Sequence, residues 1–188
     1  LKRNMGKQDH YAAAFGGLNI ITFNSDETVS VKPIIKDSLS IKNLSDKLML
    51  FFTGSRFKRD ASKILKSQTE ATESKFETLK TMRDLVPQLQ KSIELDNHDN
   101  FGRLLNDNWL LKKTITNNIS NKIIDDLYNK AIKDGALGGK LLGAGGGGFL
   151  CFYVNQNIQE KIKKSLSELY NLQFQFENHG TQITYYDQ

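Results

Sequence analysis

Cysteine, proline and long hydrophobic runs are scarce in this sequence. The single cysteine, Cys151, excludes an intramolecular disulfide, and with it the small secreted domains that disulfides hold together. No apolar stretch approaches the roughly 20 residues that a membrane-spanning helix needs, so no membrane partner is expected. No secretory leader is visible, and the expected location is the cytoplasm. Two prolines among 188 residues, without a low-complexity tract, favour a folded domain over disorder.

Charge of one sign is only in mild excess. Twenty-six Lys and Arg stand against 21 Asp and Glu, which gives a net charge of +5. This excess suits an anionic ligand such as a nucleotide or a sugar phosphate, and it equally suits a solvated surface. A nucleic-acid binder would cluster basic side chains with stacking aromatics. The aromatics here fall mostly at periodic apolar positions, so nucleic acid is not an expected partner.

Metal-ligating residues are also few. The three histidines, His10, His98 and His179, have no metal-ligand spacing among themselves or with Cys151. A metal site made only of protein ligands is therefore not expected. Cys151 lies in the apolar run 149–154, which favours a buried and unreactive thiol.

Hydrophobic periodicity predicts a block of helices flanked by strands. Apolar residues recur every three or four positions in 76–93, 101–115 and 119–131, which predicts three amphipathic helices, with Lys112 as a polar break in the second. Ser120 is the expected N-cap of the third helix and Gly135 its stop. Further helices are expected at 8–15, 60–68 and 158–169, and strands at 18–23, 28–35, 48–53, 141–142, 149–154, 174–176 and 182–186. This order predicts an α+β domain.

The most informative segment is a glycine run near the C-terminal end. Five of the six residues Gly143, Ala144, Gly145, Gly146, Gly147 and Gly148 are glycine. Glycine costs conformational entropy and contributes no side-chain contact, so a close approach of this backbone to another group is the simplest explanation. The run contains G-x-G-x-x-G, but a dinucleotide-binding loop needs a helix after it and here a strand is expected. Contact with phosphate, or with a phosphate-binding loop, stands beside the alternative of a plain hairpin turn.

The start of the chain holds a second candidate. Asp9 lies where a helix is expected to begin, so a helix cap is one interpretation of this carboxylate. The other is that Asp9 orients a sugar hydroxyl, or accepts its proton, during phosphoryl transfer. The basic cluster of Ser55, Arg56, Lys58 and Arg59 has two interpretations as well, a sugar-phosphate contact or a solvated helix start.

Two segments together resemble the GHMP kinase superfamily. Residues 6–17, Gly-Lys-Gln-Asp-His-Tyr-Ala-Ala-Ala-Phe-Gly-Gly, are similar to the acidic segment of that family. Residues 140–149, Lys-Leu-Leu-Gly-Ala-Gly-Gly-Gly-Gly-Phe, are similar to its third glycine motif. The first segment, with residues 51–54 and 120–128, resembles in particular the D-glycero-D-manno-heptose 7-phosphate kinases. The resemblance covers essentially the whole chain.

The resemblance implies an activity, a site and a fold. The activity is ATP-dependent phosphorylation of the anomeric hydroxyl of a heptose 7-phosphate, with Mg²⁺ bridging the nucleotide phosphates. The implied site has Asp9 as catalytic residue, the loop 143–148 against the nucleotide-phosphate loop, and substrate contacts from Lys7, His10, Arg59 and Lys140. The implied fold is a ferredoxin-like C-terminal domain in residues 41–188, preceded in residues 1–40 by the tail of the N-terminal kinase domain.

Three features depart from the family pattern. His10 stands where Gln commonly follows the active-site Asp. Because a polar side chain is retained, we expect the activity of the site to be adjusted rather than lost. Arg59 comes later after Thr53-Gly54 than the family's arginine does. The family's first motif and its phosphate loop belong upstream of Leu1, so the chain is expected to be the C-terminal part of an enzyme, with the N-terminal kinase domain as its partner.

Two alternatives remain open from the sequence. Another sugar-1-kinase of the superfamily, such as a fucose kinase, fits the same motifs, because they fix the phosphate chemistry better than the sugar. A noncatalytic binding module is the alternative from a different class, since the nucleotide-binding loop is missing from these residues.

Overall fold

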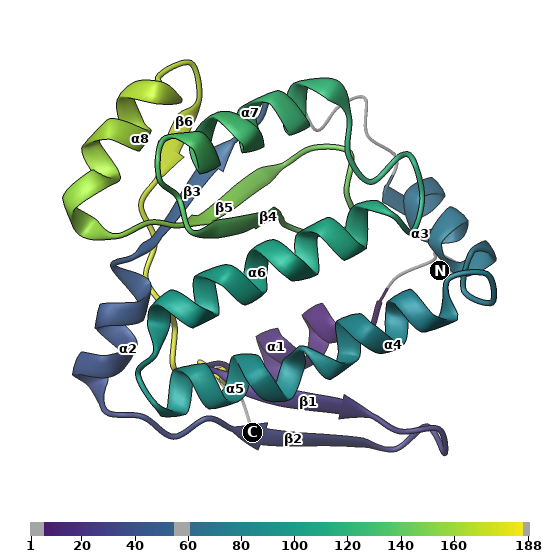
Figure 1. The fold of residues 1–188 in the computed structure, drawn as a ribbon. Coiled ribbons are helices and arrows are strands. Elements are labelled where there is room, and N and C mark those ends of the chain that lie inside the picture. The colour runs from purple at the N-terminus through teal and green to yellow at the C-terminus, as the bar shows by residue number, and fades with distance from the viewer. Residues whose placement is uncertain (1–5, 55–60, 186–188) are drawn as a thin grey trace.

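The computed structural model describes residues 6–54 and 61–185 as an α+β fold (Figure 1). The elements are α1 (Gln8–Phe15), β1 (Asn19–Phe23), β2 (Val29–Pro33), α2 (Ser38–Ser45), β3 (Leu48–Phe52), α3 (Ala61–Glu70), α4 (Phe76–Asp84), α5 (Val86–Glu94), α6 (His98–Lys113), α7 (Lys122–Lys133), β4 (Gly138–Leu141), β5 (Phe149–Tyr153), a 3₁₀ turn (Gln156–Ile158), α8 (Gln159–Ser165) and β6 (Tyr170–Leu172).

The main sheet has four antiparallel strands in the order β4-β5-β3-β6. Along the chain, β3 is followed by a helical block, then by the β4–β5 pair, α8 and β6. A β-α-β-β-α-β succession with its first and third strands in the middle of the sheet is the ferredoxin-like arrangement. The fold class expected from the sequence is therefore confirmed.

The core forms where α7 and α8 meet one face of this sheet. Residues of β3 and β5 alternate between faces, so Met49 and Phe51 lie opposite Phe152 and Leu150 on the same side. Helix α7 is strongly amphipathic and buries its apolar stripe against them, which stabilises both elements. The buried residues of this cluster are Met49, Phe51, Ile64, Trp109, Ile115, Ile119, Ile124, Leu127, Tyr128, Ala131, Ala136, Leu141, Leu150, Phe152, Val154, Ile162 and Leu166.

Helix α6 packs along the edge strand β4. The backbones come so close that a Cβ on Gly138 would overlap the carbonyl oxygen of Gly102, and a Cβ on Gly102 would lie 2.6 Å from the ring of Tyr153. Glycine is otherwise unfavourable inside both a helix and a strand. Close approach of α6 to the sheet explains why glycine stands at both positions.

The first 40 residues contribute a separate two-stranded hairpin. Strands β1 and β2 pair antiparallel from Asn19↔Pro33 to Phe23↔Val29. Helix α1 touches the hairpin through Tyr11, whose ring meets that of Phe23 edge-on at 5.7 Å. The boundary expected after residue 40 falls within α2, and the two-domain division stays a prediction.

Most expected elements are present, but several details differ, among them the strand expected at 141–142, which is β4 at Gly138–Leu141. The apolar repeat of 76–93 forms two helices, α4 and α5, and Pro87 lies in the first turn of α5. Asn121, not Ser120, caps α7, because its side chain accepts a bond from the Ile124 amide at 3.0 Å while Ser120 donates to Asp125.

The expected closing strands are wrong as well. The last strand is β6, at Tyr170–Leu172, whereas 174–176 and 182–185 belong to no strand, and residue 186 lies outside the described residues. The reason is tertiary, because Tyr170–Leu172 pair with β3. Phe174 and Phe176 instead pack ring to ring at 5.8 Å.

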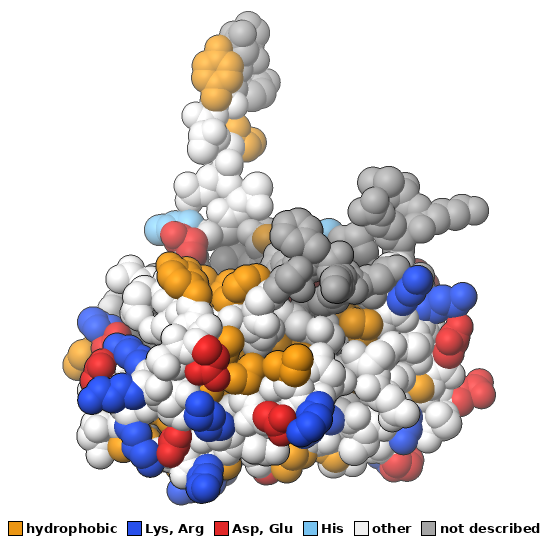
Figure 2. All heavy atoms as spheres, turned by 90° about the horizontal axis from the view of Figure 1, so that it is seen from above, with side chains coloured by type: hydrophobic (Ala, Val, Ile, Leu, Met, Phe, Trp, Pro, Cys, Tyr) orange, Lys and Arg blue, Asp and Glu red, His pale blue; other side chains and the backbone are white. Residues whose placement is uncertain are grey.

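The surface carries mixed charge. Figure 2 shows Lys and Arg side chains interspersed with Asp and Glu on the face that it presents, and it shows the last described residues projecting from the body. Ile183 and Tyr185 in that projection are 84% and 79% exposed. Among the described residues, no helix has the length and apolar character to cross a membrane.

Cys151 supplies a first test of the packing. The thiol is buried on β5, and burial raises its pKa to about 12. Since the thiolate is the reactive form, we expect iodoacetamide to label native protein at pH 8 at least about 100-fold more slowly than protein unfolded in urea. Mass spectrometry of timed samples measures both rates, and equal rates would contradict the described packing of β5.

Candidate functional site

The glycine run forms the connection between β4 and β5. Gly143, Gly145, Gly146, Gly147 and Gly148 have φ values of 78°, 122°, 74°, 149° and 113°. Residues with a Cβ rarely adopt positive φ, so the path of this loop is available to glycine and to little else. A plain two-residue hairpin turn would not need five such positions.

One side of the loop lies directly on the α6–α7 connection. The Gly146 amide donates to the carbonyl oxygen of Ile119 at 2.8 Å. A Cβ on Gly145 would lie 2.8 Å from both the Cα and the carbonyl oxygen of Ile119. Ile119 is itself fully buried, so the backbone it presents cannot easily move away. The close approach predicted from composition is therefore confirmed, and at Gly145 its partner is protein backbone.

The end of the loop is fixed by Thr53, directly after β3. The Thr53 amide donates to the Gly148 carbonyl oxygen at 2.8 Å. The Thr53 hydroxyl lies 3.0 Å from the same oxygen and accepts from the Gly148 amide at 3.1 Å. These bonds continue the β3–β5 ladder beyond Phe52 and Phe149, and they give the loop a rigid end.

Two polar side chains hold the start of the loop. Lys112 of α6 donates to the Gly143 carbonyl oxygen at 2.7 Å, and Gln68 of α3 donates to the Ala144 carbonyl oxygen at 2.9 Å. Sequence reasoning missed Gln68, and it noted Lys112 only as a break in an apolar repeat. That break was the available signal, because a charged residue at a core-facing helix position needs a partner.

The loop leaves backbone donors for an anion. Among the described residues, the Gly143 and Ala144 amides form no hydrogen bond, while their carbonyl oxygens each accept one. Gly143 is exposed and Ala144 half-buried. Adjacent free amides with positive-φ glycines beside them suit phosphate oxygens, so these residues fit a nucleotide phosphate group.

Asp9 lies in the first turn of α1 and is exposed. The N-cap position belongs to Lys7, whose backbone is helical and whose side chain makes no capping bond. Within the described chain the Asp9 carboxylate forms no hydrogen bond or ion pair, so the capping interpretation is not realised. The Asp9 carboxylate is therefore exposed and available to a ligand.

The other expected site residues are scattered. Lys7 and His10 are exposed on α1 beside Asp9. Lys140 is half-buried on β4 and donates to Asn108 of α6 at 3.1 Å, and burial lowers the pKa of its ammonium group. Arg59 lies outside the described residues. The structure therefore joins the glycine loop to Thr53, Gln68, Lys112 and Ile119, and it shows no bond between that loop and Asp9.

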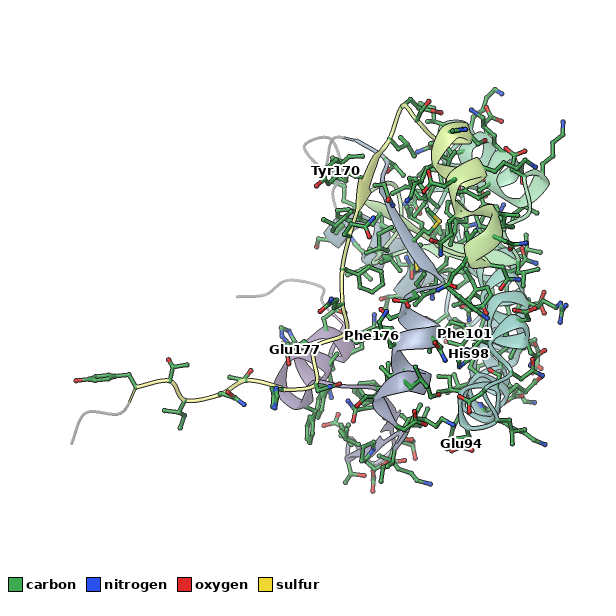
Figure 3. All side chains as sticks on the ribbon, turned by 90° about the vertical axis from the view of Figure 1, so that its left-hand side faces the viewer. Glu94, His98, Phe101, Tyr170, Phe176 and Glu177 are labelled. Atoms are coloured by element: carbon green, nitrogen blue, oxygen red, sulfur yellow. The ribbon has the colours of Figure 1, made fainter. Side chains whose placement is uncertain are left out.

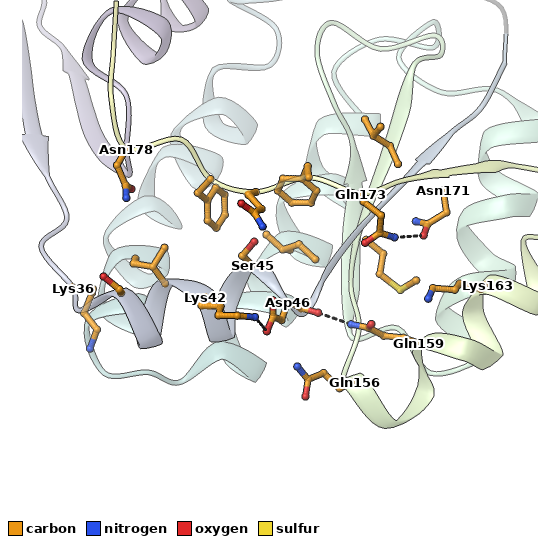
Figure 4. Close-up of a pocket in the computed structure, with 18 residues that line it drawn as sticks. Lys36, Lys42, Ser45, Asp46, Gln156, Gln159, Lys163, Asn171, Gln173 and Asn178 are labelled. Atoms are coloured by element: carbon orange, nitrogen blue, oxygen red, sulfur yellow. Dashed lines mark hydrogen bonds and ion pairs between the residues drawn. The ribbon is translucent and has the colours of Figure 1, made fainter.

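A wide groove lies at the other end of β3, between α2, α8 and the C-terminal segment (Figure 4). Its volume is about 1030 Å³, and its three lysines, Lys36, Lys42 and Lys163, are each held by a carboxylate within 2.7 Å. The paired carboxylates would repel an anionic ligand and compete with it for these lysines. We therefore place the candidate phosphate site at the glycine loop rather than in this groove.

In the part of the chain that the structure describes, no three His, Cys, Asp or Glu side chains are grouped so that they could hold a metal ion. The glycine loop and Asp9 remain the candidate site residues.

Comparison with known proteins points to one class of protein. Residues 85–172 match the family described as GHMP kinases C terminal. The chain is 29% identical over 162 residues to the D-glycero-alpha-D-manno-heptose 7-phosphate kinase of Campylobacter jejuni, a match covering 86% of this chain and 48% of that protein.

Two solved structures are similar over nearly the whole chain. One is a D-glycero-D-manno-heptose 1-phosphate kinase from Bacteriodes thetaiotaomicron, with a TM-score of 0.60 and 25% identity over 94% of this chain and 47% of that one. The other is a putative sugar kinase from Campylobacter jejuni, with a TM-score of 0.63 and 27% identity over 93% of this chain and 50% of that one. The chain spans about half the length of these relatives.

Proposed function

We propose that this chain is the C-terminal part of an ATP-dependent sugar kinase that phosphorylates the anomeric hydroxyl of a heptose 7-phosphate. The glycine loop is the observation that carries the proposal. Its backbone is fixed on Ile119 and Thr53, and its Gly143 and Ala144 amides form no hydrogen bond within the described residues, which suits a loop bordering transferred phosphate. The heptose phosphate kinases among the relatives support the sugar class.

Asp9 is the proposed catalytic residue. Its carboxylate would accept the proton of the sugar hydroxyl or orient that hydroxyl toward the γ-phosphate. The free carboxylate on α1 supports this role, because no described protein group competes for it. Lys7, His10, Lys140 and Arg59 are the proposed substrate contacts. The Asn108 bond restrains the Lys140 ammonium, so Lys140 would act at the sugar only if it exchanged that partner.

The nucleotide would be shared with an N-terminal domain. We infer that residues 1–40 complete that domain, that residues 41–188 form the C-terminal one, and that the phosphate loop lies upstream of Leu1. Loop residues 143–148 would close on the nucleotide phosphates from the C-terminal side. Mg²⁺ would neutralise charge on the phosphates when bound, and its ligands would be largely phosphate oxygens and upstream residues.

The sugar itself is the open part of the proposal. The names of the relatives share a heptose phosphate but differ in the phosphate position, 7-phosphate in one and 1-phosphate in the other. Another sugar-1-kinase activity is the second candidate. A screen of heptose 7-phosphate, heptose 1-phosphate, fucose and galactose with one enzyme preparation separates these candidates.

The test compares two proteins in the same assay. The 188-residue chain and a version extended upstream through the phosphate loop are each given Mg²⁺-ATP and heptose 7-phosphate. We expect turnover only in the extended version, because half of the phosphate contacts would be missing from the shorter one. Turnover of another sugar alone would move the assignment to that sugar. Folded but inactive extended protein would favour a noncatalytic binding module.

A further inference from the structure

Helix α1 is poorly held by its own residues. It has eight residues and none of them is buried. An isolated helix of this length is unstable in water, so contacts outside α1 must maintain it. Tyr11 supplies one such contact, on the ring of Phe23.

The C-terminal segment supplies the others. The Gly17 amide donates to the Glu177 carbonyl oxygen at 2.8 Å. The Thr181 amide donates to the carbonyl oxygens of Ala13 at 3.1 Å and Ala14 at 3.2 Å, and its hydroxyl reaches Ala13 at 3.3 Å. The last carbonyl groups of a helix have no partner within the helix, and here Thr181 satisfies two of them.

Two glycines allow the C-terminal segment to pass directly over the end of α1. A Cβ on Gly180 would overlap the Ala14 carbonyl oxygen and lie 2.7 Å from the carbonyl carbon of Phe15. A Cβ on Gly16 would lie 2.6 Å from the His179 carbonyl oxygen. The obstructing atoms are all backbone, so a side chain at either position would force the two segments apart.

The segment that follows β6 is also packed against the C-terminal domain. It leaves the main sheet at β6, and Phe176 packs against the second hydrophobic cluster, whose buried members are Leu44, Ile93 and Tyr153. Figure 3 shows Phe176 and Glu177 on the stretch that runs from β6 to α1. Residues 176–181 therefore join the C-terminal sheet to the helix that bears Asp9, although 167 residues of sequence separate Asp9 from Phe176.

We propose that residues 176–181 form a strap that fixes α1 to the C-terminal domain, with Gly180 as a positioning residue for Asp9. The strap fixes the position of the Asp9 carboxylate relative to the C-terminal domain, which also carries the glycine loop. Its effect on turnover rests on the proposed role of Asp9 in phosphoryl transfer, whereas its effect on α1 does not.

The test is Gly180→Ala, with His179→Ala as matched control. The His179 side chain is 74% exposed and bonds only to Glu177 among the described residues, so its removal leaves the backbone crossing in place. Hydrogen exchange with peptide mass spectrometry on the 188-residue chain compares α1 in the three proteins. In Gly180→Ala we expect amides of α1 to exchange about 10-fold faster or more, with unchanged exchange in α7 and β5.

Kinetics of the extended version provide the second measurement. Gly180→Ala should lower kcat about 10-fold or more and leave KM for ATP nearly unchanged, because displaced Asp9 affects the transferred proton more than nucleotide binding. Unchanged α1 exchange would overturn the strap. Faster α1 exchange with normal kcat would overturn the positioning role.

A second variant covers the case in which Gly180→Ala does not fold. A chain ending at Asn178 lacks Gly180 and Thr181 but keeps Phe176 and every buried residue of both clusters. It should show the same fast exchange in α1, and protection equal to that of the full chain would overturn the proposal. The Asp9→Asn variant tests the proposed function separately, since it leaves the strap intact.

Discussion

In the extended enzyme, Asp9→Asn is expected to lower kcat by about 10²- to 10⁴-fold while KM for the sugar changes much less. The substitution keeps the shape of the side chain and removes its negative charge. A group that accepts a proton or orients the attacking hydroxyl acts mainly in the transition state, so its loss falls on kcat. Asp9 forms no bond to the described protein, so the fold should be unaffected.

Steady-state kinetics with varied ATP and varied sugar check this expectation. Asp126→Asn is the control, because Asp126 is an exposed carboxylate on α7 whose pairing with Lys122 is a surface contact. It should keep the parent kcat. A fully active Asp9→Asn enzyme would remove Asp9 from the mechanism and leave the glycine loop as the remaining part of the proposed site.

The second large effect is expected at Gly145. Gly145→Ala places a Cβ 2.8 Å from the backbone of Ile119, and it does so at a φ of 122°. The unfavourable φ costs roughly 1–3 kcal/mol and the forced displacement roughly another 1–3 kcal/mol. The loop should therefore shift, with loss of stability and, in the extended enzyme, of turnover.

Gly147→Ala separates the two causes. Gly147 has a φ of 149°, but among the described residues an added Cβ would lie nearest the Thr53 hydroxyl, at 3.9 Å. Gly147→Ala should therefore lose only the stability that the unfavourable φ costs. In urea unfolding of the 188-residue chain, the free energy of unfolding of Gly145→Ala should be about 1–3 kcal/mol lower than that of Gly147→Ala. Equal stabilities of the two variants would show that contact with Ile119 does not constrain the loop.

The sequence predicted the elements better than their pairing. Patterns of apolar residues located α6, α7 and the central strands β3 and β5, because burial of one helix face or of a whole strand dictates those patterns. They failed at the C-terminal end, where Phe174 and Phe176 look like strand residues. Pairing with β3 selected Tyr170–Leu172 instead, and that choice depends on which neighbours lie within reach.

The candidate site shows the same division. Glycine content marked the loop 143–148, since five of its six residues have a positive φ that other residues rarely adopt. Lys112 was noticed only as a polar break and Gln68 was missed, because a polar residue on a helix is ordinary until its partner is known. Each bonds to a carbonyl oxygen of the loop, 31 and 76 positions away along the chain.

The sequence by itself determined the α+β class, the resemblance to GHMP kinases and the two segments that carry candidate chemistry. These are local properties, set by periodicity and by residues with special backbone or acid–base behaviour. Only the tertiary structure decided that the glycine loop rests on Ile119 and Thr53, and that Gly180 crosses the end of α1. Those contacts join distant parts of the chain, and the packing of the whole domain selects them.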